Sequence, residues 1–390
     1  MSVFKRLSFL MAVTAIVGST LTGCSSSDEK ASAEPAELVD FTSVIDADVV
    51  WERWAGDGAG VDSWLRLKPG VDGDSIYVCD ADGDCYAYNR HTGDKLWSVD
   101  VDLRVSGGVG AGEGRVAVGT LDGQLIVLSG QDGSELFRKQ LTSEVLSSPA
   151  IRNGLLVVQS QNGHVFGFDA ETGDQKWHYD ASLPLLSLRG SADPVVTAKV
   201  TYASFANGKV VALNNDSGVA LWEKRVSIPS GKSDLEKLAD VDGTPVITND
   251  TMYAVGFNGF VRAVDLFSGR VKWQKEFSSW VGPAYGFGQV YVALDDGEIV
   301  ALDDRSSSVN WKQESLLHRR LTRPVTLGNY LVVGDFDGYL HFISQLAGTF
   351  AERIRIDRDG LLSEPVVVDD TLYIYSSDGT LAAVQIRNDS

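Results

Sequence analysis

A short turn motif recurs eight times along the chain and constrains its fold more than any other feature. Each copy is an Asp-Gly or Asn-Gly pair between two apolar strands, and such pairs readily adopt the positive φ of a tight hairpin. The glycines of the eight pairs are Gly83, Gly123, Gly163, Gly208, Gly259, Gly297, Gly338 and Gly379, with spacings of 40, 40, 45, 51, 38, 41 and 41 residues. A period of about 40 residues with about four strands per repeat is typical of a propeller blade. The sequence therefore predicts an all-β fold, an eight-bladed β-propeller with four antiparallel strands per blade.

A large aromatic ring recurs at a fixed place after the hairpins. In the first repeat Trp97 follows the turn residue Gly93 by four positions; Phe137 takes the same place in the second repeat, and Trp311 follows Ser307 in the sixth. The same spacing joins Gly173 to Trp177, Gly218 to Trp222 and Gly269 to Trp273. Burial of such a ring contributes about 2–3 kcal/mol, so we expect these rings to pack one blade on the next. Stacking on a sugar or a cofactor is the alternative role.

The two ends of the repeat region complement each other. The eighth repeat ends at Ile386–Arg387 before an outer strand can form, whereas Val49-Val50-Trp51 has the pattern of an outer strand with no hairpin before it. We expect this N-terminal strand to complete the last blade and close the ring, so that no sheet edge stays exposed. The predicted propeller covers residues 46–387, followed by a tail at 388–390.

The N-terminus has the pattern of an export signal. Lys5-Arg6 precedes an apolar run that is too short for an ordinary spanning helix, which predicts a signal peptide over residues 1–23. Leu-Thr-Gly-Cys at 21–24 resembles the bacterial lipobox, which implies lipidation of Cys24; an ordinary signal that happens to contain a Cys is the alternative. Residues 24–45 are rich in Ser, Ala and Glu and predict a flexible tether. Ser25, in place of an Asp, favours the outer membrane by analogy with lipoprotein sorting in Gram-negative bacteria.

The strong negative charge excludes some partners. The formal charge is −19, and removal of residues 1–23 changes it to −21 because Lys5 and Arg6 are lost. Such a body is repelled by nucleic acid and by anionic lipid. We therefore predict no nucleic-acid partner and leave membrane contact to the lipid anchor.

Cys79 and Cys85 flank the first hairpin. If the loop is Ala81-Asp82-Gly83, the two side chains face each other across the strands, and the oxidising periplasm allows a disulfide. If the loop is only Asp82-Gly83, they lie diagonally and a bridge is strained. Both possibilities stay open, and a loop this short promises little global stabilisation.

Motifs that carry chemistry are scarce. The five histidines have no zinc-ligand spacing, and no Gly-x-Ser-x-Gly motif occurs. The segments 80–84 and 335–338 resemble calcium loops only in part, and hairpin turns explain their acids. We predict no catalytic, metal-binding or cofactor-binding residue. Arg319, Arg320 and Arg323 form the only basic cluster, which either pairs with neighbouring acids or receives an acidic partner.

The repeat is stretched at two adjacent places. One insertion follows Trp177 and contains Leu185, Leu186 and Leu188; the other covers residues 227–242. Connections from outer to inner strands project from the same face as the hairpins, so both insertions are expected on one rim. Clustered exposed leucines bordered by charge indicate a protein contact, unless they fold back onto the blade.

These features together resemble the BamB family of outer-membrane assembly lipoproteins. The resemblance covers essentially the whole mature chain, and its narrower part lies in Leu-x-Leu-Arg-Gly at 186–190 and Asp-Val-Asp-Gly-Thr-Pro at 240–245. It implies a scaffold of the β-barrel assembly machine whose two insertions bind the periplasmic POTRA domains of BamA. The residues that match the family's partner-binding positions are Leu186, Leu188, Arg189, Asp240 and Asp242. The strong acidity and the Cys79/Cys85 pair depart from the family pattern.

The resemblance implies no enzymatic activity and no cofactor, together with a location at the periplasmic face of the outer membrane and contact with unfolded outer-membrane protein precursors. One alternative is a periplasmic lectin or solute-binding propeller, which requires exposed aromatic rings at the central channel. A PQQ-dependent dehydrogenase is less favoured, because such enzymes are longer and carry a vicinal cysteine pair and a calcium cage.

Overall fold

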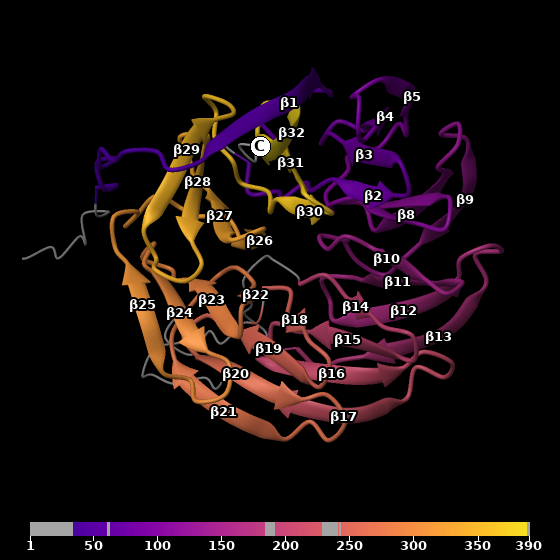
Figure 1. The fold of residues 1–390 in the computed structure, drawn as a ribbon. Helices are drawn as coiled ribbons and strands as arrows, with labels where there is room; N and C mark the ends of the chain where they lie inside the picture. The colour runs from indigo at the N-terminus through magenta and orange to yellow at the C-terminus, as the bar shows by residue number, and fades with distance from the viewer. Residues whose placement is uncertain (1–33, 61–62, 184–191, 228–240, 242, 388–390) are drawn as a thin grey trace, which may run out of the picture. The chain divides into compact units, whose positions relative to one another are not determined.

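The structure is a computed structural model that describes residues 34–60, 63–183, 192–227, 241 and 243–387. In this part of the chain every regular element is a β-strand, and eight four-stranded antiparallel sheets form a ring (Figure 1). None of the described residues belongs to a helix that is long and apolar enough to span a bilayer. The prediction of an eight-bladed β-propeller is confirmed.

The strands follow the ring in chain order, and each blade is numbered from its innermost strand. Blade 1 comprises β2 (Gly70–Asp72), β3 (Ser75–Cys79), β4 (Asp84–Asn89) and β5 (Lys95–Asp100), and blade 2 comprises β6 (Gly110–Gly112), β7 (Arg115–Gly119), β8 (Gln124–Ser129) and β9 (Glu135–Gln140). Blade 3 comprises β10 (Ala150–Arg152), β11 (Leu155–Gln159), β12 (His164–Asp169) and β13 (Gln175–Asp180), and blade 4 comprises β14 (Val195–Val196), β15 (Val200–Ser204), β16 (Lys209–Asn214) and β17 (Ala220–Arg225). Blade 5 comprises β18 (Val246–Ile247), β19 (Thr251–Val255), β20 (Phe260–Asp265) and β21 (Val271–Glu276), and blade 6 comprises β22 (Ala284–Gly286), β23 (Gln289–Ala293), β24 (Ile299–Asp303) and β25 (Val309–Gln313). Blade 7 comprises β26 (Val325–Leu327), β27 (Tyr330–Gly334), β28 (Tyr339–Ser344) and β29 (Phe350–Arg355), and blade 8 comprises β30 (Val366–Val368), β31 (Thr371–Tyr375), β32 (Thr380–Arg387) and β1 (Asp46–Trp54).

Burial changes from the middle of a blade to its outside. The two middle strands are covered on both faces; in blade 6, for example, all five residues of β23 and the first four residues of β24 are buried. The outer strand alternates instead, as in β5, where Leu96 is exposed and Trp97 is buried. The apolar core therefore lies between neighbouring blades, and the outer strands present their polar face to solvent.

The recurring rings pack blade against blade, as predicted. Trp97 of blade 1 lies against Gly133 in the turn between the outer two strands of blade 2, where an added Cβ would be 2.8 Å from the indole. Its Nε1 donates a hydrogen bond to the carbonyl oxygen of Gly130 at 3.0 Å. Trp51, Trp177, Trp222, Trp273 and Trp311 donate in the same way to the following blade. These contacts account for the ring positions without a ligand.

The N-terminal strand closes the ring. β1 pairs with β32 in the register Asp46↔Arg387 to Trp54↔Thr380, so that the first and the last strand of the chain lie side by side in blade 8 (Figure 1). This outcome confirms the predicted closure.

Closure also explains why blade 7 has no Trp. Each ring packs on the turn that joins the outer two strands of the next blade. In blade 8 those two strands are the first and the last strand of the chain, so no such turn joins them. A Trp in blade 7 would have no turn to pack on, and Glu352 occupies its place in β29.

The predicted tether needs a correction, because residues 35–45 pack along blades 6 and 7. The amide of Ala36 donates to the Leu317 carbonyl at 2.9 Å, and the amide of Val44 donates to the Ala351 carbonyl at 2.9 Å. Phe41 stacks on Phe350 with ring centroids 5.2 Å apart. Leu38 and Ile45 also pack against the apolar core. The Ser-, Ala- and Glu-rich start of the predicted tether hid this packing, because the apolar side chains gather only near its C-terminal end.

Candidate functional site

The residues predicted to bind a partner lie outside the described part of the chain. They are Leu186, Leu188 and Arg189 in the first insertion and Asp240 and Asp242 in the second. Cys24, the predicted lipidation site, also lies outside it. The structure does describe the residues that follow each insertion, and these define where the two insertions rejoin the ring.

The segments that follow the two insertions meet at the centre of the ring. Asp193 precedes the innermost strand of blade 4, and Thr244 precedes the innermost strand of blade 5. The amide of Asp193 donates to Oγ1 of Thr244 at 3.0 Å, and the Asp193 carboxylate accepts from the amide of Ser148 at 2.6 Å. The insertions themselves lie outside the described residues, so their placement on one rim stays a prediction.

A cavity of about 270 Å³ lies at this centre. All eight connections between the outer strand of one blade and the inner strand of the next contribute to its lining. Its lining includes Trp64, Arg66, Lys68, Asp193, Trp280, Arg323 and Glu364. The cavity is therefore a product of the whole ring and not of one blade.

Four charged side chains form an ion cluster in the wall of the cavity. Lys68 pairs with Asp193 and, at 2.6 Å, with Oε1 of Glu364, whose other oxygen lies 3.3 Å from Nη1 of Arg323. Burial lowers the pKa of Lys68, but the carboxylates of Asp193 and Glu364 raise it by more, to above its ordinary value. Burial likewise raises the pKa of Glu364, but Lys68 and Arg323 together bring it down to about 2. Lys68 and Glu364 are therefore both charged at neutral pH.

Two indoles and one guanidinium, those of Trp64, Trp280 and Arg66, also line the cavity. Trp64 is 45 % exposed and Trp280 is 38 % exposed. Trp280 stacks on Phe257 with ring centroids 3.8 Å apart, and Arg66 donates to the Trp280 carbonyl at 3.5 Å. Partly exposed Trp beside Arg is typical of binding surfaces.

The sequence prediction missed Trp64, Arg66 and Trp280. One signal was available: six of the nine Trp residues occupy the repeated blade position, and Trp54, Trp64 and Trp280 do not. Trp64 and Trp280 both lie in connections between blades. A Trp outside the repeat position has no predicted packing role, and this exception could have singled them out.

Two arginines of the basic cluster, Arg319 and Arg323, pair with nearby acids. Nε of Arg319 lies 2.7 Å from Asp335, with its other end against Asp337, and Arg323 pairs with Glu364. Arg319 is buried. Pairing with neighbouring acids therefore accounts for two of the three arginines.

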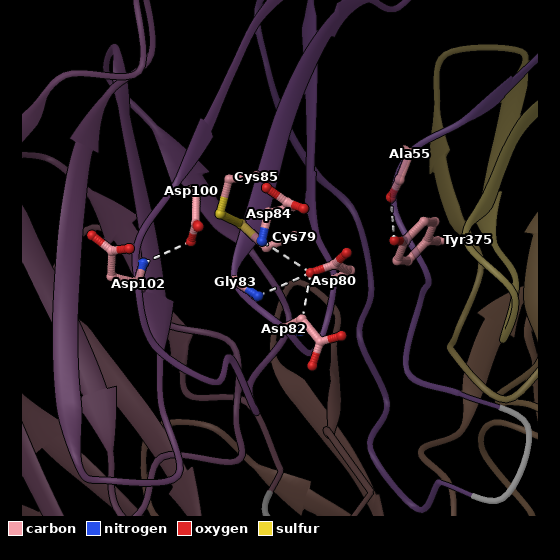
Figure 2. The surroundings of a disulfide bond; sticks show 10 residues. All are labelled: Ala55, Cys79, Asp80, Asp82, Gly83, Asp84, Cys85, Asp100, Asp102 and Tyr375. Atoms are coloured by element: carbon pink, nitrogen blue, oxygen red, sulfur yellow. Dashed lines mark hydrogen bonds between the residues drawn. A yellow bond between two sulfur atoms is a disulfide. The ribbon is translucent and has the colours of Figure 1, made fainter.

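The hairpin of blade 1 holds a disulfide. Cys79 and Cys85 are directly opposite residues of β3 and β4, with Cα atoms 4.0 Å apart, and the structure joins their sulfurs (Figure 2). The adjacent Asp80 is buried, and its carboxylate accepts from the amides of Asp82, Gly83 and Asp84 at 2.9–3.0 Å. These bonds engage one Asp80 oxygen, and the amide of Asp57 binds the other at 3.1 Å. The acids that resemble a calcium loop thus serve the turn.

Among the described residues, Asp357, Asp359 and Asp378 form one group whose carboxylate oxygens lie within 4.8 Å of one another. Burial and a hydrogen bond with Asp378 raise the pKa of Asp357.

The chain is similar to known assembly factors over nearly its full length. The family model described as outer membrane protein assembly factor BamB matches residues 81–313. The outer membrane protein assembly factor BamB of Pseudomonas aeruginosa is 42 % identical over 98 % of this chain and 99 % of its own length. The crystal structure of BamB from Moraxella catarrhalis superposes with a TM-score of 0.80 at 26 % identity, covering 87 % of this chain and all of that one.

The same fold occurs in enzymes. A quinohemoprotein alcohol dehydrogenase from Pseudomonas putida superposes with a TM-score of 0.70 over 88 % of this chain and 76 % of its own, but is only 13 % identical. A likeness at this level concerns the fold alone.

Proposed function

Because this chain belongs to the BamB family of outer membrane protein assembly factors, we propose that it acts in the β-barrel assembly machine as a non-enzymatic scaffold that binds the POTRA domains of BamA. The proposal also places it at the periplasmic face of the outer membrane, anchored through lipid on Cys24. In this role the protein positions BamA, assists the folding and insertion of outer-membrane proteins, and contacts their unfolded precursors.

One observation supports the position of the proposed binding site. The hydrogen bond between Asp193 and Thr244 joins the segments that follow the two insertions, so both insertions rejoin the ring at one place. We assign BamA binding to Leu186, Leu188, Arg189, Asp240 and Asp242. Leucines supply an apolar anchor, and the charged residues set orientation and register.

The test is the affinity of the purified protein for the BamA POTRA domains, measured by isothermal titration calorimetry. A variant with Leu188→Ala, Arg189→Ala and Asp242→Ala is expected to bind at least about tenfold more weakly, since loss of several interface contacts exceeds 1.4 kcal/mol. A matched control carries Leu136→Ala, Arg138→Ala and Asp132→Ala on the outside of blade 2 and is expected to bind like the parent. If the first variant binds the POTRA domains as tightly as the parent, the assigned site is wrong. If the parent itself does not bind them, BamA is not the partner.

The cavity supports one second candidate function. A solute-binding propeller requires exposed aromatic rings at its centre, and Trp64 and Trp280 lie there. Saturable quenching of Trp fluorescence by a free sugar would support this alternative. If no sugar in a panel quenches the fluorescence, the scaffold remains as the proposed function.

A further inference from the structure

We propose that the central cavity is a third element of the partner-binding surface and receives one acidic side chain of the partner, which pairs with Arg66 between Trp64 and Trp280. This inference rests on the proposed function, because it concerns the same partner. It adds Trp64 and Arg66 from the connection between blades 8 and 1, and Trp280 from the connection between blades 5 and 6; neither insertion contains these residues.

Position is the first support. Asp193 follows the first insertion, Gly243 and Thr244 follow the second, and all three line the cavity. A partner that contacts both insertions therefore reaches the space beside these residues. The cavity continues the proposed interface toward the axis of the ring.

Charge is the second support. Among the described residues, three cations, Arg66, Lys68 and Arg323, and two carboxylates, Asp193 and Glu364, line the cavity. Lys68 and Arg323 are engaged by those two acids, whereas Arg66 has no carboxylate within ion-pair distance among the described residues. The described lining thus carries one more cation than carboxylates in a protein whose formal charge is −19, and this excess complements an acidic group.

Size and lining are the third support. The volume of about 270 Å³ lies below the range of about 300–1,000 Å³ that is usual for small-molecule sites, which favours a side chain over a free solute. Leu65, Leu146, Val281 and Leu362 add apolar wall to the two indoles. An acid next to apolar neighbours on the partner would match this mixture, because Trp and Arg in a desolvated pocket are typical anchors of interfaces.

The site is also held in place before a partner arrives. Phe257 fixes the plane of the Trp280 ring, and the Trp280 carbonyl orients Arg66. The Lys68 ion cluster joins the segments from blades 1, 4, 7 and 8 behind them. A preformed pocket loses less side-chain entropy on binding, so more of the contact energy contributes to affinity.

The test compares Arg66→Glu with Arg305→Glu, a matched charge reversal at a side chain that is 94 % exposed in a turn of blade 6. Affinity for the purified BamA POTRA domains is measured for both, with circular dichroism as the folding check. Arg66→Glu is expected to weaken binding about 10- to 100-fold, as for other close interfacial charge pairs, and Arg305→Glu less than about twofold. Arg66→Gln is expected to give an intermediate loss, and it replaces the reversal if Arg66→Glu fails to fold.

The aromatic part is tested by Trp64→Ala against Trp54→Ala, a Trp that is 64 % exposed on β1. Only the first is expected to weaken binding, by about tenfold or more. Reversal of single acidic residues on the POTRA domains then identifies the acid, since one reversal is expected to restore binding to Arg66→Glu.

The outcomes separate the two proposals. If the parent binds and the insertion variant does not, while Arg66→Glu and Trp64→Ala bind like the parent, the cavity inference is overturned and the proposed function stands. If the parent does not bind the POTRA domains, both fall. Saturable sugar binding that Trp64→Ala abolishes, with unchanged POTRA affinity, would also overturn the inference and assign the cavity to a solute.

Discussion

Single glycines decide how closely one blade approaches the next. Gly133 has φ +74° and faces the indole of Trp97, and Gly114 in the same blade also has φ +74° but open space around it. The backbone strain of a side chain is therefore equal at the two positions, and only the ring contact differs.

Gly133→Ala is expected to lower the free energy of unfolding by about 2–4 kcal/mol, because about 1 kcal/mol of left-handed strain is joined by displacement of the ring. Gly114→Ala is expected to cost about 1 kcal/mol. Equilibrium unfolding in denaturant measures both. Equal losses would mean that the indole yields without cost and does not set the blade spacing.

A buried histidine makes blade 7 sensitive to pH. Nε2 of His341 lies 2.9 Å from Asp335, and its Nδ1 accepts from Nε of Arg353 at 3.2 Å. The ring proton therefore sits on Nε2, and the ring is neutral. Burial lowers the pKa of His341, and the opposing effect of Asp335 does not restore it. Burial raises the pKa of Asp335, but His341 and Arg319 lower it by more.

These directions fix the sign of the pH effect. A lowered His341 pKa means that the unfolded chain binds more protons than the folded one just below the unfolded value of about 6.5, so stability falls as pH decreases there. Asp335 adds a second loss below about pH 4, as its carboxylate becomes protonated.

His341→Asn removes the titrating ring, so the decline in unfolding free energy between pH 7 and 5 is expected to be shallower than in the parent. His91→Asn, at an exposed position, is the control and is expected to keep the parent slope. Denaturant unfolding at a series of pH values gives the slopes. Identical slopes for parent and His341→Asn would exclude this histidine as the source.

At the scale of strands, β1 contributes the closure of the ring. Its pairing with β32 joins residues that are more than three hundred positions apart, and Trp51 adds the contact to blade 1. Without β1, β32 is an unpaired edge strand, and such edges template aggregation.

Deletion of residues 46–55 is therefore expected to unfold or aggregate the protein, as measured by size-exclusion chromatography and thermal unfolding. A chain that starts at residue 44 keeps β1, loses most of the packed segment 35–45 and is expected to stay monomeric with reduced stability. A monomeric, cooperatively unfolding deletion variant would show that blade 8 holds with three strands.

At the scale of the whole molecule, the central ion cluster ties distant blades together. Lys68 belongs to the connection into blade 1, Asp193 to that into blade 4, and Glu364 to that into blade 8. Their side chains are only 16–20 % exposed, so removal of the lysine leaves two acids largely buried with reduced compensation.

Lys68→Met is expected to cost about 3–4 kcal/mol, in line with breaking a buried ion pair. Lys209→Met is the control, since the Lys209–Glu223 pair on blade 4 is exposed and such pairs contribute about 1 kcal/mol or less. Chemical denaturation of the two variants gives the comparison. A loss below about 1 kcal/mol for Lys68→Met would mean that the cluster orients the connections without stabilising the ring.

The fold was predictable because it is encoded locally and repeatedly. Each Asp-Gly or Asn-Gly turn specifies its own hairpin, and eight copies at one period leave a ring as the way to bury the sheets; the surplus outer strand at Val49–Trp51 even indicated how the ring closes. The partners of residues 35–45 were not predictable, since Leu38, Phe41 and Ile45 are apolar but nothing in the local sequence assigns them to blades 6 and 7.

The sequence by itself determined the blades, their number, the packing role of the repeated rings and the places where the repeat is stretched. Only the tertiary structure decided what lies at the centre. Trp64, Asp193, Trp280 and Glu364 are separated by up to three hundred residues and share no local pattern. They meet because ring closure brings all eight connections to one axis, and a contact that depends on closure has no signature in any single stretch of the chain.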